Sequence, residues 1–169
     1  MGQIYLFTGT GAGKTTNALG LALRSIGHNH KVVIIQFMKW WKNIGEYKIR
    51  KKLKNYEIYQ FGRKGWIGFG NLTKEDRKLA EEGLKFAKKI LQKKKPHLLV
   101  LDEICLALYS KLLEINDVLE VLKKIPKRTT VVLTGRYAPK ELIDRADFVN
   151  EIIDSKYPQN IPPTKGIQY

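Results

Sequence analysis

The sequence predicts an α/β protein with a mostly parallel sheet covered by helices on both faces. Short β-branched or apolar runs alternate with stretches of helical period, an order typical of βαβ units. Several runs are too uniformly apolar for strands with one face in water. A glycine-rich turn at residues 9–16 directly follows the first run and opens a helix.

Each element is expected from its own pattern. The strands are expected at residues 3–8, 31–37, 56–61, 97–102, 129–134 and 148–154. The helices are expected at residues 14–26, 73–94, 103–110, 116–125 and 139–146. Gly27 is expected to stop the first helix. Residues 39–55, 62–72 and the tail from 155 are less regular, and loops that handle a second substrate are expected there.

The helix of residues 73–94 has the clearest signals. Thr73 is expected to cap it, with Asp76 three residues on as in a capping box. The core-facing stripe is expected to consist of residues at three- and four-residue spacing: Leu79, Gly83, Phe86, Ala87, Ile90 and Leu91.

Length and composition indicate one ordinary domain, residues 1–169. Hydrophobic residues make up 43% of the chain and charged residues 28%, and no tract is long enough to cross a bilayer. The start of the chain lacks the pattern of a signal peptide, so a cytoplasmic protein is expected. The single cysteine, Cys105, excludes an internal disulfide and has apolar neighbours, which predicts a buried hydrophobic residue.

The net charge of +15 favours anionic partners such as phosphates, carboxylates or nucleic acid. The sign of the charge does not choose among them. Much of the excess lies in the lysine-rich residues 48–54 and 88–95, where a solvated helix face is the simpler interpretation.

A phosphate-binding loop is predicted at residues 8–16, which read Thr-Gly-Thr-Gly-Ala-Gly-Lys-Thr-Thr. Its glycines allow positive φ and turn backbone N–H groups inward, Lys14 supplies a mobile charge, and Thr15 offers a hydroxyl to Mg²⁺. The strict Walker A pattern has glycine where Thr8 stands, so triphosphate binding is better supported than γ-phosphoryl transfer. The predicted ATP contacts are Gly9, Thr10, Gly11, Ala12, Gly13, Lys14, Thr15 and Thr16.

Acidic and basic residues follow two later strands. Residues 98–103 read Leu-Leu-Val-Leu-Asp-Glu, the form of a Walker B element, and predict a P-loop NTPase fold of the RecA-like kind. Asp102 and Glu103 are therefore expected beside Mg²⁺, although a helix-capping aspartate is an alternative for Asp102. Arg136 follows the strand of residues 129–134 and is either a phosphate contact or a surface ion pair.

The chemistry has several alternatives at this point. The sequence lacks an arginine-rich kinase lid, a guanine-specifying motif, and a nucleophile with its base. His28, His30 and His97 are expected to be structural or solvent-facing. One alternative is a RecA-like ATPase or nucleic-acid-binding module, which the positive charge and loop aromatics able to stack on bases would suit. Another is a small-molecule kinase, which would transfer only the γ-phosphate of ATP and leave ADP.

Segments along nearly the whole chain resemble the corrinoid adenosyltransferases of cobalamin biosynthesis and salvage. They are the short loop at residues 9–16, Arg-Ser-Ile-Gly-His at 24–28, Val-Ile-Ile-Gln-Phe-Met-Lys at 33–39, Gly-Glu at 45–46, Leu-Asp-Glu at 101–103, Val-Leu-Thr-Gly-Arg at 132–136, Ala-Pro-x-Glu-Leu-Ile-Asp-x-Ala-Asp at 138–147 and Lys-Gly-Ile-Gln-Tyr at 165–169. The resemblance implies transfer of the 5′-deoxyadenosyl group of ATP to Co(I) of a reduced corrinoid, with release of triphosphate. It also implies reversed ATP on the loop, an electron donor for the cobalt, and a homodimer.

The resemblance also implies roles for residues. Lys14, Thr15 and Glu103 are then catalytic, and Thr15, Asp102 and Glu103 are the Mg²⁺ contacts. Arg24, Glu46 and Arg136 join the nucleotide site.

The sequence departs from the family at three places. Residues 65–68 read Gly-Trp-Ile-Gly where the family usually has Gly-Phe-Thr-Trp, so Trp66 and Phe69 are the candidates for the corrinoid face, with loop packing as the alternative. Trp40 and Trp41 are similarly placed. Ala12 stands where the family often has lysine, which removes one positive charge from the phosphate site. No helix precedes the first strand, so the site is expected to be more open, to take a cover from a partner subunit, or to do without one.

Overall fold

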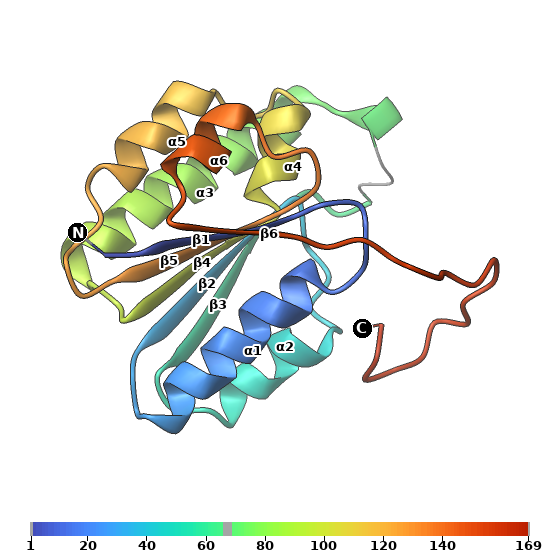
Figure 1. Cartoon of the computed structure of the whole chain (residues 1–169), viewed down its shortest axis with the longest axis horizontal. Helices are drawn as coiled ribbons and strands as arrows, with labels where there is room; N and C mark the ends of the chain where they lie inside the picture. Colours follow the sequence, from blue (N-terminus) through green and yellow to red (C-terminus); the bar gives the residue numbers. More distant parts are fainter. Residues whose placement is uncertain (1, 66–68, 169) are drawn as a thin grey trace.

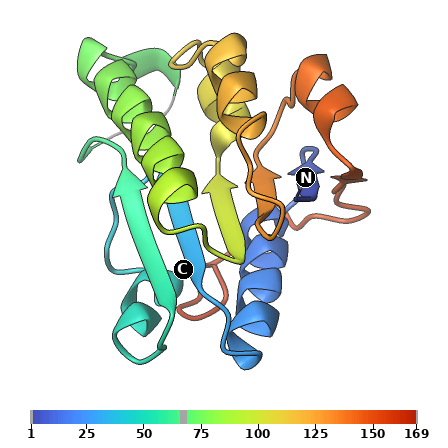
Figure 2. The same ribbon diagram turned by 90° about the vertical axis from the view of Figure 1, so that its left-hand side faces the viewer.

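A six-stranded parallel sheet forms the centre of the molecule in the computed structural model, which describes residues 2–65 and 69–168, with Phe69 described by its backbone only. The strands are β1 Ile4–Thr8, β2 Val32–Phe37, β3 Tyr56–Phe61, β4 Leu98–Asp102, β5 Thr130–Thr134 and β6 Phe148–Glu151. Their order is β3-β2-β4-β5-β1-β6, and every pair is parallel. Figure 2 shows the strand arrows running in a common direction. The predicted fold class is confirmed.

Helices cover both faces of the sheet (Figure 1). One face carries α1 Lys14–Gly27 and α2 Gly45–Lys48, and the other carries α3 Lys74–Lys93, α4 Ile104–Tyr109, α5 Ile115–Leu122 and α6 Lys140–Arg145. Two short 3₁₀ helices, η1 Ile49–Lys51 and η2 Phe69–Asn71, lie in connections. The buried side chains form two clusters, one on each side of the sheet, as expected for strands that are apolar on both faces.

The strand order determines which strand ends lie next to each other. β5 lies between β1 and β4, so the strand that leads into the glycine-rich loop is not hydrogen-bonded to the strand that ends in Asp102. Because all strands are parallel, their carboxyl ends still meet at one edge. Thr8, Phe37, Asp102 and Thr134 end their strands there.

Helix α3 begins as predicted but turns its core face slightly differently. Thr73 and Asp76 form the expected capping box. Gly83, Ala87, Ile90 and Leu91 are buried, whereas Leu79 and Phe86 are only partly buried, and Ala80 and Leu84 are buried in their stead. The contact at Gly83 explains the difference, because a Cβ atom there would lie 2.9 Å from the ring of Phe37. The helix approaches the sheet most closely along its small residues.

Three local expectations were wrong. Gly27 is the last residue of α1, and the left-handed residue after the helix is Asn29, with a φ of 58°. Residues 39–55 contain α2 and η1 rather than irregular chain alone. β6 ends at Glu151, because the next residues turn toward the glycine-rich loop, where the Gly11 N–H donates to the Ile152 carbonyl at 2.8 Å.

Among the described residues, no helix combines the length and the apolar character needed to span a membrane.

Candidate active site

The loop between β1 and α1 has the geometry of a phosphate-binding turn. Gly9 and Gly13 both have φ values near 100°, in the left-handed region that favours glycine. A Cβ atom on Gly9 would lie 2.3 Å from the Ile152 carbonyl oxygen, so no larger residue fits there. Lys14 is 7% exposed and its ammonium donates to the Gly11 carbonyl, so the loop curls around this side chain. The loop is therefore held in shape by its own lysine.

Several charges converge on Lys14. Burial lowers the pKa of Lys14 and the nearby Arg136 guanidinium lowers it further, against the opposing carboxylates of Glu103 and Asp154. The end of β5, the end of β4 and the segment after β6 thus all bring a charged group to the loop. Two cations near one point form a favourable environment for a polyanion.

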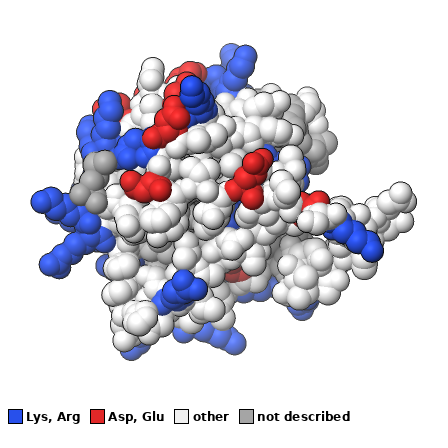
Figure 3. Space-filling model, viewed as in Figure 1, with Lys and Arg blue, Asp and Glu red and all other residues white. Residues whose placement is uncertain are grey.

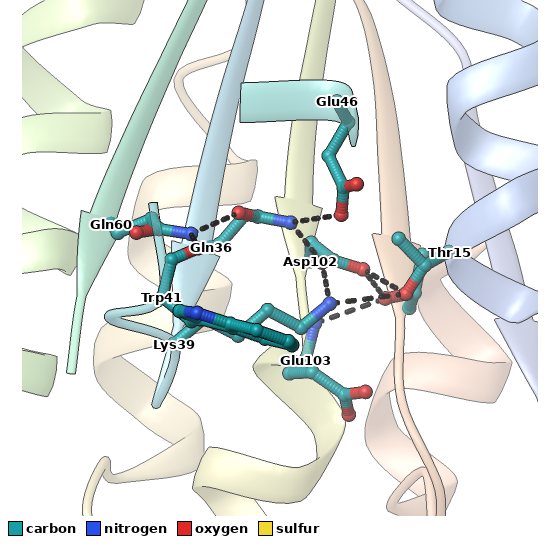
Figure 4. Close-up of polar contacts among 9 residues, drawn as sticks. Thr15, Gln36, Lys39, Trp41, Glu46, Gln60, Asp102 and Glu103 are labelled. Carbon is teal, nitrogen blue, oxygen red and sulfur yellow. Dashed lines mark hydrogen bonds and ion pairs between the residues drawn. The ribbon is translucent and has the colours of Figure 1, made fainter. Parts of the chain in front are cut away.

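Asp102 is the centre of a buried polar network (Figure 4). Its Oδ1 accepts hydrogen bonds from the hydroxyls of Thr15 at 2.8 Å and Thr134 at 2.7 Å. Its Oδ2 accepts from Lys39 Nζ at 2.6 Å and from Gln36 Nε2 at 3.0 Å. Burial alone would raise the pKa of Asp102, but Lys39 and these hydrogen bonds outweigh it and lower the pKa, so the carboxylate is ionised.

The alternative interpretation of Asp102 as a helix cap is wrong. The residue at the N-cap of α4 is Glu103, and no side chain caps this helix. All four hydrogen bonds to Asp102 come from side chains of other elements. Asp102 therefore organises the site rather than the end of the following helix.

The network continues from Asp102 through the end of β2. Gln36 is fully buried, donates to Glu46 Oε1 at 3.4 Å and accepts from Gln60 Nε2 at 2.9 Å. Gln60 also donates to the Trp41 carbonyl at 3.3 Å. These contacts connect the segment of residues 39–46 to the sheet, and they place Glu46 near the start of α1.

Glu103 has features that fit a bound cation. Its φ is 64°, a left-handed conformation that costs roughly 1–3 kcal/mol at a residue other than glycine. Its Oε2 atom is buried, and no group in the described part of the chain hydrogen-bonds to it. Burial and the Asp102 carboxylate raise the pKa of Glu103, while Lys39, Lys14 and Arg136 oppose the rise. With the oxygens of Thr15 and Asp102 nearby, this set has the hard oxygen donors that Mg²⁺ prefers.

A pocket of about 500 Å³ opens beside the start of α1. Thr15, Thr16 and Lys39 line its side toward the loop, and Glu46 and Tyr56 line it from α2 and β3. The tail closes another side with residues 166–168, since the chain beyond β6 loops back toward α1 and α2 (Figure 1). Its volume is in the range of sites for small organic ligands.

The structure brings together most of the predicted site residues. Gly9 to Thr16, Glu46, Asp102, Glu103 and Arg136 all lie at the carboxyl edge of the sheet. Trp66 lies outside the described residues, and so does the side chain of Phe69.

Arg24 is placed elsewhere. It lies in the last turn of α1, ten residues after Lys14 and hence roughly 15 Å away along the helix. There it lines a different pocket together with His28, His30 and His97. The rings of His30 and His97 stack, with centroids 3.8 Å apart. Within one chain, Arg24 and the three histidines are therefore remote from the loop.

Four residues that sequence reasoning did not assign belong to the site. They are Gln36, Lys39, Thr134 and Asp154. Gln36 carries a signal, because it is a polar residue near the end of a strand that is otherwise apolar, and it pairs with Asp102 in the sheet register.

Comparison with known proteins agrees with this geometry. The chain matches the family described as ATP:corrinoid adenosyltransferase BtuR/CobO/CobP over residues 1–169. It is 31% identical over 172 residues to a corrinoid adenosyltransferase of Escherichia coli K12, covering 99% of this chain and 86% of the relative. Corrinoid adenosyltransferases of Pseudomonas aeruginosa and Sinorhizobium are 30% and 33% identical, over 99% of this chain and 84% and 80% of theirs. The chain therefore belongs to the ATP:corrinoid adenosyltransferase family, enzymes that transfer the adenosyl group of ATP to corrinoids of cobalamin biosynthesis.

Proposed function

We propose that ATP binds this chain with its triphosphate on residues 9–16 and that its 5′ carbon faces a reduced corrinoid. The observation that carries the proposal is the convergence of Lys14, Thr15, Asp102 and Glu103 at one edge of the sheet, where cations and hydroxyls gather around space for a polyanion. The whole chain would act as one domain, since its six strands form one sheet.

The reaction needs alignment rather than proton transfer. Co(I) of the corrinoid substrate supplies an electron pair to the 5′ carbon of ATP, the C5′–O5′ bond breaks, and its pair leaves with inorganic triphosphate. No proton moves, which accounts for a site rich in cations and without an assigned general base. The loop N–H groups, Lys14 and Arg136 would stabilise the charge of the departing triphosphate.

Thr15, Asp102 and Glu103 would hold Mg²⁺. The buried, unbonded Oε2 of Glu103 and the ionised Asp102 support this choice. Bound there, Mg²⁺ would neutralise phosphate charge in both the substrate and the leaving group.

The pocket beside α1 is the proposed place for the nucleoside. It adjoins Thr15 and Thr16, and Glu46 offers a carboxylate oxygen to a ribose hydroxyl. We propose that ATP binds in the reversed orientation, with the γ-phosphate where other P-loop proteins hold the α-phosphate, so that the 5′ carbon is exposed to the corrinoid. Trp41, which is 43% exposed near Lys39, lies close to where the corrinoid would enter (Figure 4), and Trp66 and Phe69 remain candidates for its face.

The remaining partners belong to the same proposal. An electron donor must reduce the cobalt before transfer, and the cytoplasm supplies ATP and such donors. A homodimer is supported by the edge strand β6, all four residues of which are exposed, including Phe148 and Val149.

Anaerobic incubation of the protein with chemically reduced cob(I)alamin, ATP and Mg²⁺ tests the proposal. We expect a light-sensitive adenosylcorrinoid and stoichiometric triphosphate. Lys14→Ala should slow transfer by about a hundredfold or more, because the buried cation of the loop is lost. Lys123→Ala, which changes an exposed lysine paired with Glu120 on the other side of the sheet, should leave the rate unchanged. Production of ADP without any adenosylcorrinoid would reject the proposal in favour of an ATPase or a kinase.

A further inference from the structure

Lys39 is held inside the proposed metal site by the backbone before it. Met38 has a φ of 59°, a left-handed conformation that few residues other than glycine adopt. The Met38 N–H donates to the Phe61 carbonyl at 2.9 Å, and Gly62 packs so closely that a Cβ atom there would lie 2.4 Å from the Met38 carbonyl carbon. The sharp turn after β2 therefore directs Lys39 back toward the sheet edge.

The ammonium of Lys39 contacts two of the three proposed Mg²⁺ contacts. Its Nζ lies 2.6 Å from Asp102 Oδ2 and 3.4 Å from Thr15 Oγ1 (Figure 4). The distance of 2.6 Å makes Lys39 and the nearly buried Asp102 carboxylate an ion pair. A cation thus lies among the oxygens that suit a divalent metal.

A buried carboxylate requires such a cation. The Asp102 side chain is 1% exposed, and an ionised group there is strongly unfavourable without a partner of opposite charge. The Lys39 side chain is 28% exposed, so it reaches the site from the solvent side. An ammonium and a magnesium ion cannot both take the same position beside Asp102 Oδ2 and Thr15 Oγ1.

We infer that Lys39 is an exchangeable cation: it occupies the metal site of the nucleotide-free enzyme and, when Mg²⁺ enters with ATP, releases Asp102 and binds the triphosphate. This inference rests on the proposed function, because it takes Mg²⁺ and ATP as the incoming ligands. The flexible four-carbon stem of lysine allows the ammonium to move while its backbone stays fixed. Lys39 is then a phosphate-binding residue in addition to Lys14 and Arg136.

Metal binding without nucleotide tests the first half of this inference. Mn²⁺, a spectroscopic probe for Mg²⁺, is titrated into the nucleotide-free protein and free Mn²⁺ is followed by electron paramagnetic resonance. Lys39→Gln keeps an amide donor for Asp102 but removes the competing charge, so it should bind Mn²⁺ at least about tenfold more tightly than the wild type. Lys42→Gln, an exposed lysine in the same loop, should match the wild type. Equal or weaker Mn²⁺ binding by Lys39→Gln would overturn the inference.

The stability of the variant is itself informative. If loss of the ammonium leaves Asp102 unpaired and unfolds Lys39→Gln, millimolar Mg²⁺ should restore its circular dichroism spectrum and its thermal transition. Failure of Mg²⁺ to restore the fold would equally overturn the inference.

Binding of inorganic triphosphate with Mg²⁺ tests the second half. The dissociation constant should rise about tenfold in Lys39→Gln and stay near the wild-type value in Lys39→Arg, which keeps the charge. An unchanged constant in Lys39→Gln would mean that Lys39 does not reach the phosphates. Adenosyl transfer by the wild type is measured in parallel. If the wild type transfers the adenosyl group but Lys39→Gln binds Mn²⁺ no more tightly than the wild type does, only the inferred role of Lys39 is overturned. Absence of activity overturns only the proposed function, because Mn²⁺ binding to the nucleotide-free protein requires no corrinoid.

Discussion

Asp154 contacts the glycine-rich loop on which we propose that the triphosphate binds. Its Oδ1 accepts a hydrogen bond from the Ala12 N–H at 3.0 Å, and its charge acts on Lys14. The neighbouring Ile152 carbonyl accepts from the Gly11 N–H. Two amides of the loop thus donate to the segment after β6, so we expect that a phosphate bound on the loop would compete with this segment for them.

Asp154→Asn should tighten nucleotide binding. The asparagine keeps a weaker acceptor for Ala12 and removes the negative charge that opposes phosphate. Because Asp154 is exposed and screened by solvent, we expect a roughly two- to fivefold lower dissociation constant for ATP. Isothermal titration calorimetry measures it, with Asp144→Asn on the exposed side of α6 as the matched control. An unchanged or higher constant would show that Asp154 does not compete with phosphate.

The residue scale also shows which parts of the site the sequence reveals. The loop and the acidic end of β4 are each encoded by adjacent residues, so the sequence alone predicts the pair Lys14 and Thr15 and the pair Asp102 and Glu103. Lys39 and Asp154 are not predicted in this way, because their roles depend on a left-handed turn at Met38 and on the path of the chain after β6. Both are isolated charges in loops, a pattern that also describes ordinary surface residues.

At the scale of elements, α3 depends on the carboxylate of Asp76. Asp76 Oδ2 accepts from the Thr73 N–H and hydroxyl, both at 2.8 Å, and its Oδ1 accepts from Arg63 Nε at 3.2 Å. Burial alone would raise the pKa of Asp76, but Thr73 and then Arg63 outweigh it and lower the pKa. The same carboxylate therefore caps the helix and fixes the segment of residues 62–72 to it.

Asp76→Asn should destabilise the protein by about 1–3 kcal/mol at neutral pH, since a cap and a buried ion pair are weakened together. An aspartate with a lowered pKa in the folded chain stabilises the fold above its ordinary value of 3.8. That contribution disappears as the pH falls through the lower folded value. Urea unfolding at pH 7 and near pH 3 should show the difference between variant and wild type shrinking in acid. A pH-independent difference, or a similar loss in the exposed Asp144→Asn, would contradict this account.

The helices show which features a sequence period predicts and which depend on packing against the sheet. The period of α3 correctly predicted a helix and its cap, because both are encoded within a few residues. The rotation of the helix was not predicted, since it follows from the contact of Gly83 with Phe37 on β2. The short helix α2 was missed for a related reason: its four residues carry too few apolar positions to show a period.

At the scale of the whole molecule, the strand order is the feature that no local pattern contains. The alternation of strands and helices predicts a parallel sheet, but β5 lies between β1 and β4 and is last but one in the sequence. This placement brings Thr134 between the loop and Asp102, where its hydroxyl both donates to Asp102 and accepts from the Glu103 N–H. The sequence predicts that the loop and the acidic end of β4 lie at one edge of the sheet, as the structure shows, whereas the position of Thr134 depends on the strand order.

The net charge of +15 is a property of the whole molecule, and it is compatible with nucleotide binding and with nucleic-acid binding. On the face shown in Figure 3, the Lys and Arg side chains lie scattered around the periphery, with acidic groups among them. On this face, such a distribution favours weak, salt-sensitive attraction to a polyanion rather than a dedicated nucleic-acid groove.

Single-stranded DNA should therefore bind weakly, lose its affinity steeply as salt rises, and leave ATP consumption unchanged. The measurement is the release of triphosphate and ADP at low salt, with and without an excess of an oligothymidine, in the presence and absence of reduced corrinoid. A matched reaction with a neutral polymer controls for crowding. We expect triphosphate only when corrinoid is present, at a rate that the oligonucleotide does not raise. ADP release stimulated by the oligonucleotide would instead indicate that the charge serves a nucleic-acid-dependent ATPase.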